Sequence, residues 1–426
     1  MRKIASLLWI FLLSTFFCYS QEFADIQLDD WIYEEGIAGV QLMVNGDPMS
    51  EPIGTLGSAT FQIAFDDLTL EVRHPKFLFI HCTHDWKNSE LNPIEYIEGF
   101  MEDEIEQYDH SFNTIEPYLH YHAEFPNNNI SFTKSGNYVL YVYDDTPDHP
   151  LLTRRFMVLE PMAAKIVADV HPAVDVNTRY THQDIDFTVF TSIYQIRNPQ
   201  QSVHATIRQN GRWDNAIYGL TYHSGMAAEL HFNYTDGRNS FPGGAEFRTF
   251  DISTLRSNSD RIVGISFVNH HNHAYVLQDD ARPYSAYESR GTMNGRCYYK
   301  NRDLRNENSE DYVFTHFTLK SEYPFNDGDV YVFGELTGWR LLDEAKLHYN
   351  KEFDFWETDI LLKQGAYNYQ YVYLPRGSSQ IDATYIEGTH YETNNIYYIF
   401  VYYQEEGTSY DRLIGFQTCS IVDNEH

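Results

Sequence analysis

Residues 134–161 read KSGNYVLYVYDDTPDHPLLTRRFMVLEP and show the two-residue period of β-structure. Tyr138, Leu140 and Val142 lie on one face of an extended chain, and the intervening apolar and aromatic residues lie on the other. Gly136 opens this segment, and turn-forming Asp and Pro residues follow it. The pattern predicts a strand, a turn and a second strand.

The same pattern returns late in the chain. Residues 365–373, GAYNYQYVY, again begin with Gly, place Tyr two positions later, and then alternate. Other short alternating segments, separated by turn signals, fill most of the remaining sequence, and helical periodicity is scarce. We therefore expect an all-β fold of three consecutive Ig-like, early-set β-sandwich modules with little helix.

The predicted modules follow a signal peptide at residues 1–20. The first module spans residues 21–161, the second 162–303 and the third 304–426, which opens with a polar linker. Aromatic residues make up 16 % of the chain, with 34 Tyr and 28 Phe, and such side chains favour strands.

The N-terminus has the features of an export signal. Arg2 and Lys3 are basic, residues 7–17 are apolar, and Ser20 is a small residue at a cleavage position. A lipoprotein anchored at Cys18 is the alternative, but a bulky residue precedes that cysteine where a small one is required. No later apolar run reaches the roughly 20 residues of a membrane-spanning helix. We expect a soluble exported protein without direct membrane insertion.

The charge balance excludes two classes of partner. Lys and Arg number 30 against 61 Asp and Glu, a formal net charge of −31. Proteins that bind nucleic acid or anionic lipid surfaces need the opposite balance. After cleavage, Cys82, Cys297 and Cys419 remain, so at most one disulfide can form, and the sequence leaves open whether any does.

Histidine is abundant, with 19 residues, and two imidazoles spaced two apart on a strand can share a metal. A zinc site needs three or four convergent ligands, however, and no local spacing supplies them. We expect structural or surface histidines, with no metal and no cofactor. The groups considered are His81, His84 and Asp85; His120 and His122; and His270, His271 and His273.

No catalytic motif is recognisable. A glycosidase needs two carboxylates that face each other across a cleft, which adjacent acidic residues do not establish. Residues 326–329, NDGD, resemble part of a calcium loop but lack its closing Glu. We expect no catalytic residues and no enzyme activity, with a hydrolase of unrecognised site as an alternative. The adjacent carboxylates are Asp66-Asp67, Asp144-Asp145 and Asp279-Asp280.

The third module also resembles glycogen- and starch-binding sandwiches, through residues 330–334, Trp339 and residues 365–373. In such modules aromatic faces stack on sugar rings, and Trp339 and Trp356 could do so here. An exported carbohydrate-binding protein that uses its C-terminal sandwich is therefore the alternative function. The competing interpretation is that both side chains are core aromatics of an architectural module.

Short blocks occur in one order along nearly the whole mature chain. They are residues 79–82 (FIHC), 85–86 (DW), 95–96 (EY), 99–100 (GF), 111–114 (SFNT), 117–118 (PY), 135–138 (SGNY) and 152–158 (LTRRFMV) in the first module; 181–183 (THQ), 209–215 (QNGRWDN), 241–244 (FPGG) and 246–248 (EFR) in the second; and 311–313 (DYV), 328–334 (GDVYVFG), 363–365 (KQG) and 410–415 (YDRLIG) in the third. Together these blocks resemble the plug proteins of the bacterial type IX secretion system. The tail after Phe416 lies outside the pattern, and no role is assigned to it.

The resemblance implies a non-enzymatic periplasmic protein associated with the inner face of the outer membrane. Such a protein caps the periplasmic opening of the translocon channel while no cargo is in transit. Its partner would be the outer-membrane translocon barrel, with no nucleic acid and no small-molecule substrate. The resemblance does not identify the partner-binding residues, the release trigger or the oligomeric state.

Overall fold

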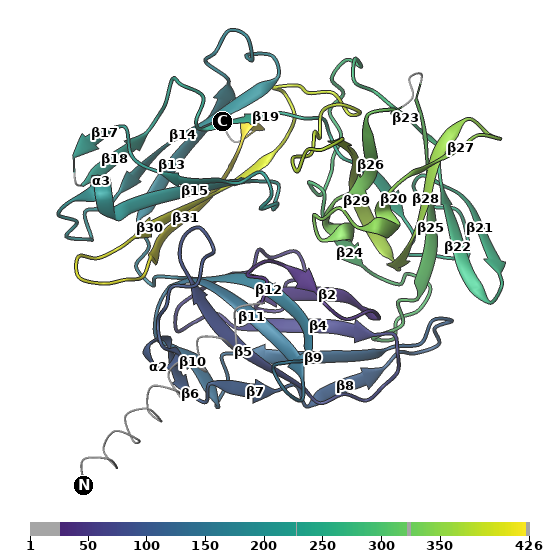
Figure 1. The fold of residues 1–426 in the computed structure, drawn as a ribbon, viewed down its shortest axis with the longest axis horizontal. Coiled ribbons are helices and arrows are strands. Elements are labelled where there is room, and N and C mark those ends of the chain that lie inside the picture. Colours follow the sequence, from purple (N-terminus) through teal and green to yellow (C-terminus); the bar gives the residue numbers. More distant parts are fainter. Residues whose placement is uncertain (1–25, 227, 322–324, 423–426) are drawn as a thin grey trace, which may run out of the picture.

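The computed structural model describes residues 26–226, 228–321 and 325–422, and most of its regular structure is antiparallel β-sheet (Figure 1). In this part of the chain, helix is limited to α2 (Pro93–Tyr96), α3 (Pro199–Ser202), the 3-10 turns η1 (Glu335–Thr337) and η2 (Asp343–Ala345), and residues 421–422, which are also 3-10. The all-β prediction with little helix is confirmed. The predicted signal peptide, residues 1–20, lies outside the described residues.

The first sandwich pairs a sheet of order β1-β12-β11-β5-β7, with β3 beside β12, against a sheet of order β2-β4-β9-β8. The short strands β6 and β10 pair with each other. The strands are β1 (Trp31–Ile32), β2 (Ile37–Val44), β3 (Ile53–Thr55), β4 (Phe61–Asp67), β5 (Pro75–Cys82), β6 (Ile97–Gly99), β7 (Glu102–Glu104), β8 (Gln107–His110), β9 (Leu119–Phe125), β10 (Ile130–Phe132), β11 (Gly136–Asp144) and β12 (Pro150–Leu159).

The Tyr-rich strand predicted from residues 134–161 is β11, at the centre of this sandwich, and β12 is the strand that follows its turn. Tyr138, Leu140 and Val142 point into the core between the two sheets. Val139, on the opposite face, belongs to a separate apolar cluster that the first sandwich shares with the second. Both faces of β11 are therefore buried, which explains why neither face is polar.

The second sandwich includes strands from two distant parts of the chain. One sheet has the order β13-β14-β18-β17, with β19 beside β14, and the other has the order β16-β15-β30-β31. The strands are β13 (Lys165–Pro172), β14 (His182–Phe190), β15 (Val203–Gln209), β16 (Ile217–Leu220), β17 (Ser224–Met226), β18 (Glu229–Phe232), β19 (Ser240–Pro242), β30 (Ile396–Tyr403) and β31 (Arg412–Ser420).

The third sandwich places β20, β24, β26 and β29 against β21, β22, β23, β25, β27 and β28. Its strands are β20 (Arg248–Asp251), β21 (Ile262–Val268), β22 (His271–Val276), β23 (Asp279–Asp280), β24 (Cys297–Tyr299), β25 (Tyr312–Lys320), β26 (Gly328–Phe333), β27 (His348–Asn350), β28 (Phe355–Lys363) and β29 (Gly365–Pro375).

The predicted boundary between residues 303 and 304 is wrong, because the sheets divide elsewhere. Strands β20–β24 were expected in the second module, yet β20 and β24 pair with β29, and β22 pairs with β25. Conversely, β15 pairs along its whole length with β30, so Ile399 and Val401 fill the core of the second sandwich. The third sandwich is thus an insertion within the second, and residues 304–311 connect two of its own strands.

The three sandwiches pack directly against one another (Figure 1). Val139 and Met157 of the first sandwich share an apolar cluster with Phe400 and Leu413 of the second. Within the described residues, no helix is both long and apolar enough to cross a membrane.

Candidate functional site

A turn after β15 lies where the three sandwiches meet. Asn210 and Gly211 have φ values of 52° and 77°, the left-handed conformation that an Asn-Gly turn provides. The Arg212 N–H donates to the carbonyl of Gln209 at 3.2 Å and closes the turn. The Asn-Gly pair within the block QNGRWDN therefore forms a tight turn. We call residues 208–215 the junction hairpin.

A largely buried carboxylate connects the three sandwiches beside this hairpin. Glu51 of the first sandwich accepts a hydrogen bond from Arg208 of the second, whose side chain is only 2 % exposed. Arg296 of the third sandwich lies 3.6 Å from the other oxygen of Glu51. Burial alone would raise the pKa of Glu51, but the two guanidinium groups outweigh it and hold that pKa below its usual value.

Aromatic rings and guanidinium groups complete the junction. The Trp213 ring meets Trp86 edge-on with 5.0 Å between centroids, and the Arg155 guanidinium lies 4.6 Å from the centre of the Trp86 ring. Arg212 lies over Phe333 of the third sandwich at 5.1 Å. The hairpin therefore contacts both of its neighbours with desolvated cation–aromatic pairs.

A small polar cavity of about 150 Å³ lies inside the junction. Four arginines and three carboxylates line it, including Arg154, Asp30 and Glu335. Burial raises the pKa values of Asp30 and Glu335. A cavity of this size holds a few water molecules. The arrangement is a packed charge network at a structural joint.

A second charged contact joins the first and third sandwiches. Asp66, fully buried, accepts hydrogen bonds from Lys363 Nζ at 2.6 Å and from Tyr312 Oη at 2.7 Å, and lies 2.6 Å from His120 Nδ1. Burial acts to raise the pKa of Asp66, but Lys363 and His120 lower it overall. The neighbouring Asp67 instead pairs with Arg73 at 2.6 Å.

The other adjacent carboxylates also serve packing or lie exposed. Asp279 accepts from Arg248, Arg261 and Tyr369, all at 2.5 Å, and is buried, whereas Asp280 is exposed. Asp144 lies near Arg73, and Asp145 is exposed. In both pairs the two carboxylates differ in exposure, as expected for consecutive strand or turn residues. None of the three forms the facing pair of a glycosidase.

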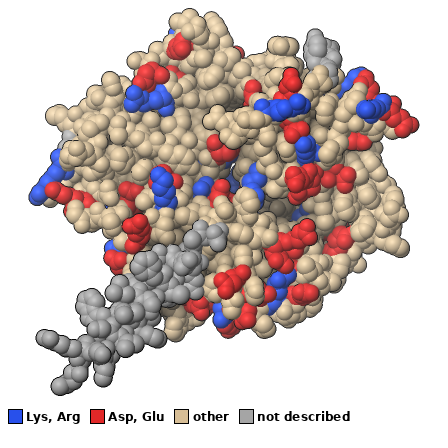
Figure 2. All heavy atoms as spheres, in the orientation of Figure 1, with Lys and Arg blue, Asp and Glu red and all other residues tan. Residues whose placement is uncertain are grey.

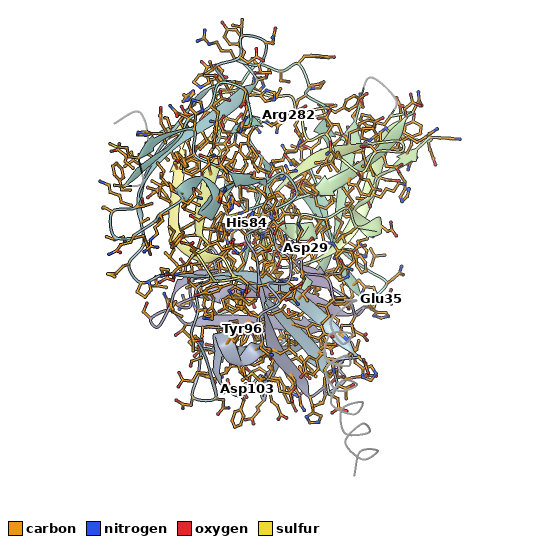
Figure 3. The ribbon with its side chains drawn as sticks, turned by 60° about the vertical axis from the view of Figure 1, so that its left-hand side comes forward. Asp29, Glu35, His84, Tyr96, Asp103 and Arg282 are labelled. Atoms are coloured by element: carbon orange, nitrogen blue, oxygen red, sulfur yellow. The ribbon has the colours of Figure 1, made fainter. Side chains whose placement is uncertain are left out.

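His81 packs within the first sandwich, whereas His84 contacts the second sandwich. His81 is buried, its Nε2 faces the carbonyl of Ser135 at 3.2 Å, and its Nδ1 accepts from Ser89 Oγ at 2.9 Å. Burial lowers the pKa of His81 to about 4, so its imidazole is neutral. His84 lies near the centre of the molecule (Figure 3), and its Nδ1 is 3.0 Å from Asp411 Oδ2 across the contact between the first and second sandwiches.

The remaining histidine groups do not converge on a metal site either. Among the described residues, no cluster of three or more His, Cys, Asp or Glu side chains could hold a metal ion. His122 lies 3.5 Å from Asp109, His271 pairs with Glu116, and His273 Nδ1 is 2.9 Å from His316 Nε2. His270 contacts the ring of Phe267, and Asp85 pairs with Lys87.

Both tryptophans proposed for sugar stacking are engaged within the protein. Trp339 packs against Phe333 at 5.5 Å and Phe247 at 6.1 Å between ring centroids. Trp356 packs against Phe325 at 5.2 Å and Tyr349 at 5.3 Å. Residues 326–329 lie at the start of β26, where Asp327 accepts from the Arg376 N–H.

The three cysteines that follow the predicted signal peptide are all buried. Cys82 and Cys297 are free thiols, and Cys419 lies in β31, which continues past Phe416. Burial raises the pKa of the Cys82 thiol to about 12. Residues 417–420 of the tail, to which the sequence blocks assigned no role, are thus part of the second sandwich.

One exposed surface stands apart from this buried network. Residues 98–109 contain β7 and β8, the edge strands of the two sheets of the first sandwich, and carry Asp and Glu but no Lys or Arg. Phe100 is 65 % exposed among these carboxylates. Figure 2 shows acidic side chains over this lower sandwich, and Figure 3 places Asp103 at its outer edge. An acidic surface with an exposed aromatic ring suits contact with a protein.

The sequence did not reveal Glu51, Arg208 and Arg296 as a connected set. Arg208 alternates with core residues along β15, and that pattern ordinarily places an arginine in solvent. The only sequence signal was its position directly before the block QNGRWDN.

Comparisons with known proteins give one family match and one similar solved structure. Residues 37–160, which contain β2–β12, match the family model described as the type 9 secretion system plug protein 1st domain. A solved structure of a hypothetical protein from Parabacteroides merdae is 34 % identical, with a TM-score of 0.88, covering 93 % of this chain and all of that one. No curated protein gave a match.

Two streptococcal structures share far less. The C-terminal domain of the Streptococcus agalactiae antigen I/II polypeptide BspA is 8 % identical, with a TM-score of 0.13, and coverage of 89 % of this chain and 97 % of that one. The C-terminal domain of the Streptococcus pyogenes protein AspA is 7 % identical, with a TM-score of 0.14, and coverage of 89 % and 98 %. These TM-scores are too low to indicate a shared fold. The family match identifies the first sandwich as a first domain of the type IX secretion system plug protein family.

Proposed function

We propose that this protein is a non-enzymatic plug that caps the periplasmic opening of the type IX secretion translocon in the outer membrane when no cargo is being transported. The observation that carries the proposal is the match of the first sandwich to the plug family's first domain. The protein would reach the periplasm through its signal peptide and associate with the inner face of the outer membrane.

The physical character of the molecule supports this role. A stopper for a wide aqueous channel has to keep its shape, because a deformable body would leak. Here Glu51 joins three sandwiches, and Asp66 joins the first to the third, through largely buried ion pairs, of which those with Arg208 and Lys363 are also hydrogen-bonded. Buried pairs of this kind are costly to break one partner at a time. The three sandwiches therefore form a stiff body.

The titratable groups support a non-catalytic role in the same way. The carboxylates and histidines considered as catalytic candidates are paired across sheets or between sandwiches, as for Asp66, Asp279 and His84. A capping role relies instead on a broad surface, and stable protein interfaces bury roughly 1,200 Å² or more in total.

The test is the permeability of the outer membrane in a strain that lacks this protein but keeps the translocon. We expect such cells to continue secreting cargo and to admit large hydrophilic antibiotics or dyes that wild-type cells exclude. Removing the translocon as well should restore the barrier, because the leak would pass through that channel. The tagged protein should co-purify with an outer-membrane barrel from detergent-solubilised envelope. Unchanged permeability together with absent co-purification would overturn the proposal.

A further inference from the structure

A second, larger cavity lies on the second sandwich, outside the junction. Its volume is about 680 Å³, and it lies between the β13–β14 connection and the loop before β19. The label β19 marks this end of the sandwich in Figure 1. The blocks THQ and FPGG, at residues 181–183 and 241–244, adjoin it, and the proposed capping role does not account for it.

Two residues that line this cavity, Asp184 and Ser240, each carry a buried polar atom with no partner among the described residues. Asp184 on β14 and Ser240 on β19 are directly opposite in the strand pairing, so their side chains share one face of the sheet. Asp184 is 3 % exposed; its Oδ2 accepts from the Val174 N–H at 2.9 Å, but its Oδ1 accepts no hydrogen bond. Ser240 Oγ is likewise unpartnered. A buried carboxylate oxygen without a donor is costly, which points to a missing donor group.

The charge of the cavity lining indicates which kind of hydrogen-bond donor could bind there. Asp175, Asp184 and Asp236 line it, and none of the described lining residues is Lys or Arg. Burial lowers the pKa of the lining His182, which is therefore neutral. Arg238, outside the lining, pairs with Asp236 at 2.5 Å. A cavity of this charge attracts a cation, and no cluster of described residues suits a metal ion.

The rim of the cavity is apolar. Val174 lines it with its side chain largely in solvent, and Val176 is 80 % exposed. Tyr180 follows in the same connection and is also exposed. Lys and Arg side chains place an aliphatic stem on such surfaces while the charged end reaches a polar partner. An apolar rim above an acidic floor matches that division within one side chain.

We propose that this cavity binds an ammonium or guanidinium group carried on an aliphatic stem, such as the side chain of a lysine or arginine. The cation donates to the Asp184 carboxylate, which turns its unpartnered oxygen toward the cavity, Ser240 Oγ turns toward the same group, and the stem lies along Val174 and Val176. The source is a basic segment of a partner protein or a free amine. The site is separate from the capping role and does not depend on it.

Methyl NMR of the full-length mature protein, labelled at valine methyl groups, tests this site with n-pentylammonium as the probe and 1-pentanol as the uncharged control. We expect the charged probe to shift the Val174 and Val176 resonances and the alcohol to leave them in place. Asp184→Asn, which keeps an oxygen to accept from the Val174 N–H, should weaken binding at least about tenfold. Asp169→Asn, an exposed carboxylate on β13 outside the lining, should bind as the wild type does.

Ser240→Ala gives a second variant that keeps the charge and should weaken binding less than Asp184→Asn does. A lysine-containing peptide and its acetyl-lysine form separate the two sources. Stronger binding of the unmodified peptide than of free pentylammonium indicates a protein partner, and the reverse indicates a free amine. Equal shifts from the amine and the alcohol would overturn the proposal. So would wild-type affinity in a folded Asp184→Asn variant, or occupation by Ca²⁺ in place of the amine.

Discussion

Single buried charges hold the sheets of this protein together, and Glu387 shows how. It lies in the connection between β29 and β30, almost completely buried, and receives Arg248 at 3.0 Å and Arg282 at 2.6 Å. Burial alone would raise the pKa of this carboxyl, but the two guanidinium groups lower it from 4.5 to about 2. The ionised form is thus strongly favoured in the folded state.

Replacing Glu387 by Gln should destabilise the protein in a pH-dependent way. At pH 7 we expect a loss of about 3–5 kcal/mol, because two buried guanidinium groups lose their carboxylate. The folded pKa is the lower one, so the stabilisation is complete above pH 4.5 and is lost as the pH falls toward 2. Denaturant unfolding at pH 7 and pH 3 measures the wild-type and variant free energies, and their difference should shrink at pH 3.

The matched control is Glu288→Gln, an exposed carboxylate paired only with Arg290 at the surface. It should leave the free energy of unfolding nearly unchanged at either pH. A difference for Glu387→Gln that is the same at both pH values would contradict the assignment.

Trp339 distinguishes an architectural third sandwich from a sugar-binding one. A Cβ on Gly295 would lie 2.2 Å from the Trp339 ring, so the glycine makes room for this side chain. Trp339→Ala should lower the free energy of unfolding by about 3–5 kcal/mol, as for large packed aromatic residues. Tyr284→Ala, at a side chain 94 % exposed, should have little effect. Full stability of Trp339→Ala, combined with loss of a wild-type affinity for an α-glucan column, would restore the carbohydrate interpretation.

At the scale of elements, the junction hairpin shows which features local sequence can predict. The pair Asn210-Gly211 is typical of a tight turn because both residues tolerate positive φ, and the structure has that turn. Its location could not be predicted, because alternation along β15 tells which residues share a face but not what covers that face. Arg208 lies on one such face and is buried against the first sandwich.

Removing the central ring of this hairpin should weaken the attachment of the first sandwich. Trp213 packs between Trp86 and Phe400 and lies 4.5 Å from the Arg208 guanidinium. Trp213→Ala should cost about 3 kcal/mol of unfolding free energy, from lost packing and lost cation–aromatic attraction. Trp213→Phe, which keeps a ring, should cost less. Equal stability of the two variants, measured by denaturant unfolding, would show that the ring does not matter.

At the scale of the whole molecule, the number of sandwiches was predictable and their connectivity was not. Strand patterns indicated three β modules, because each core requires its own set of alternating residues. The modules were assumed to be consecutive, yet β30 and β31 return to the second sandwich after the third is complete. Nothing in a Tyr-rich strand such as residues 396–403 specifies its partner, so this pairing emerges only in three dimensions. The joining charges were missed for the same reason.

A double-mutant cycle on Asp66 and Lys363 tests whether the first and third sandwiches are energetically coupled. Lys363→Met leaves the fully buried Asp66 without its ammonium partner and should cost about 3–5 kcal/mol. Adding Asp66→Asn should recover part of that loss, because the unpaired charge is then gone. Unfolding free energies of the two single variants and the double variant give the coupling. Strict additivity would mean that the two sandwiches do not stabilise each other here.

The insertion of the third sandwich sets an order in which the chain can fold from its N-terminus. The chain enters the insertion at Gly243 and Gly244 and returns beside them, where the His390 N–H donates to Gly244 at 2.8 Å and Asn395 Nδ2 to Gly243 at 2.8 Å. All strands of the first and third sandwiches precede residues 396–420 in the sequence. β15, in contrast, can pair with β30 only after residues 396–403 are available. Completion of the second sandwich is therefore the final step, and it simultaneously covers the outer face of β11. A protein whose last two strands close its central joint becomes rigid only when those strands are available to pair.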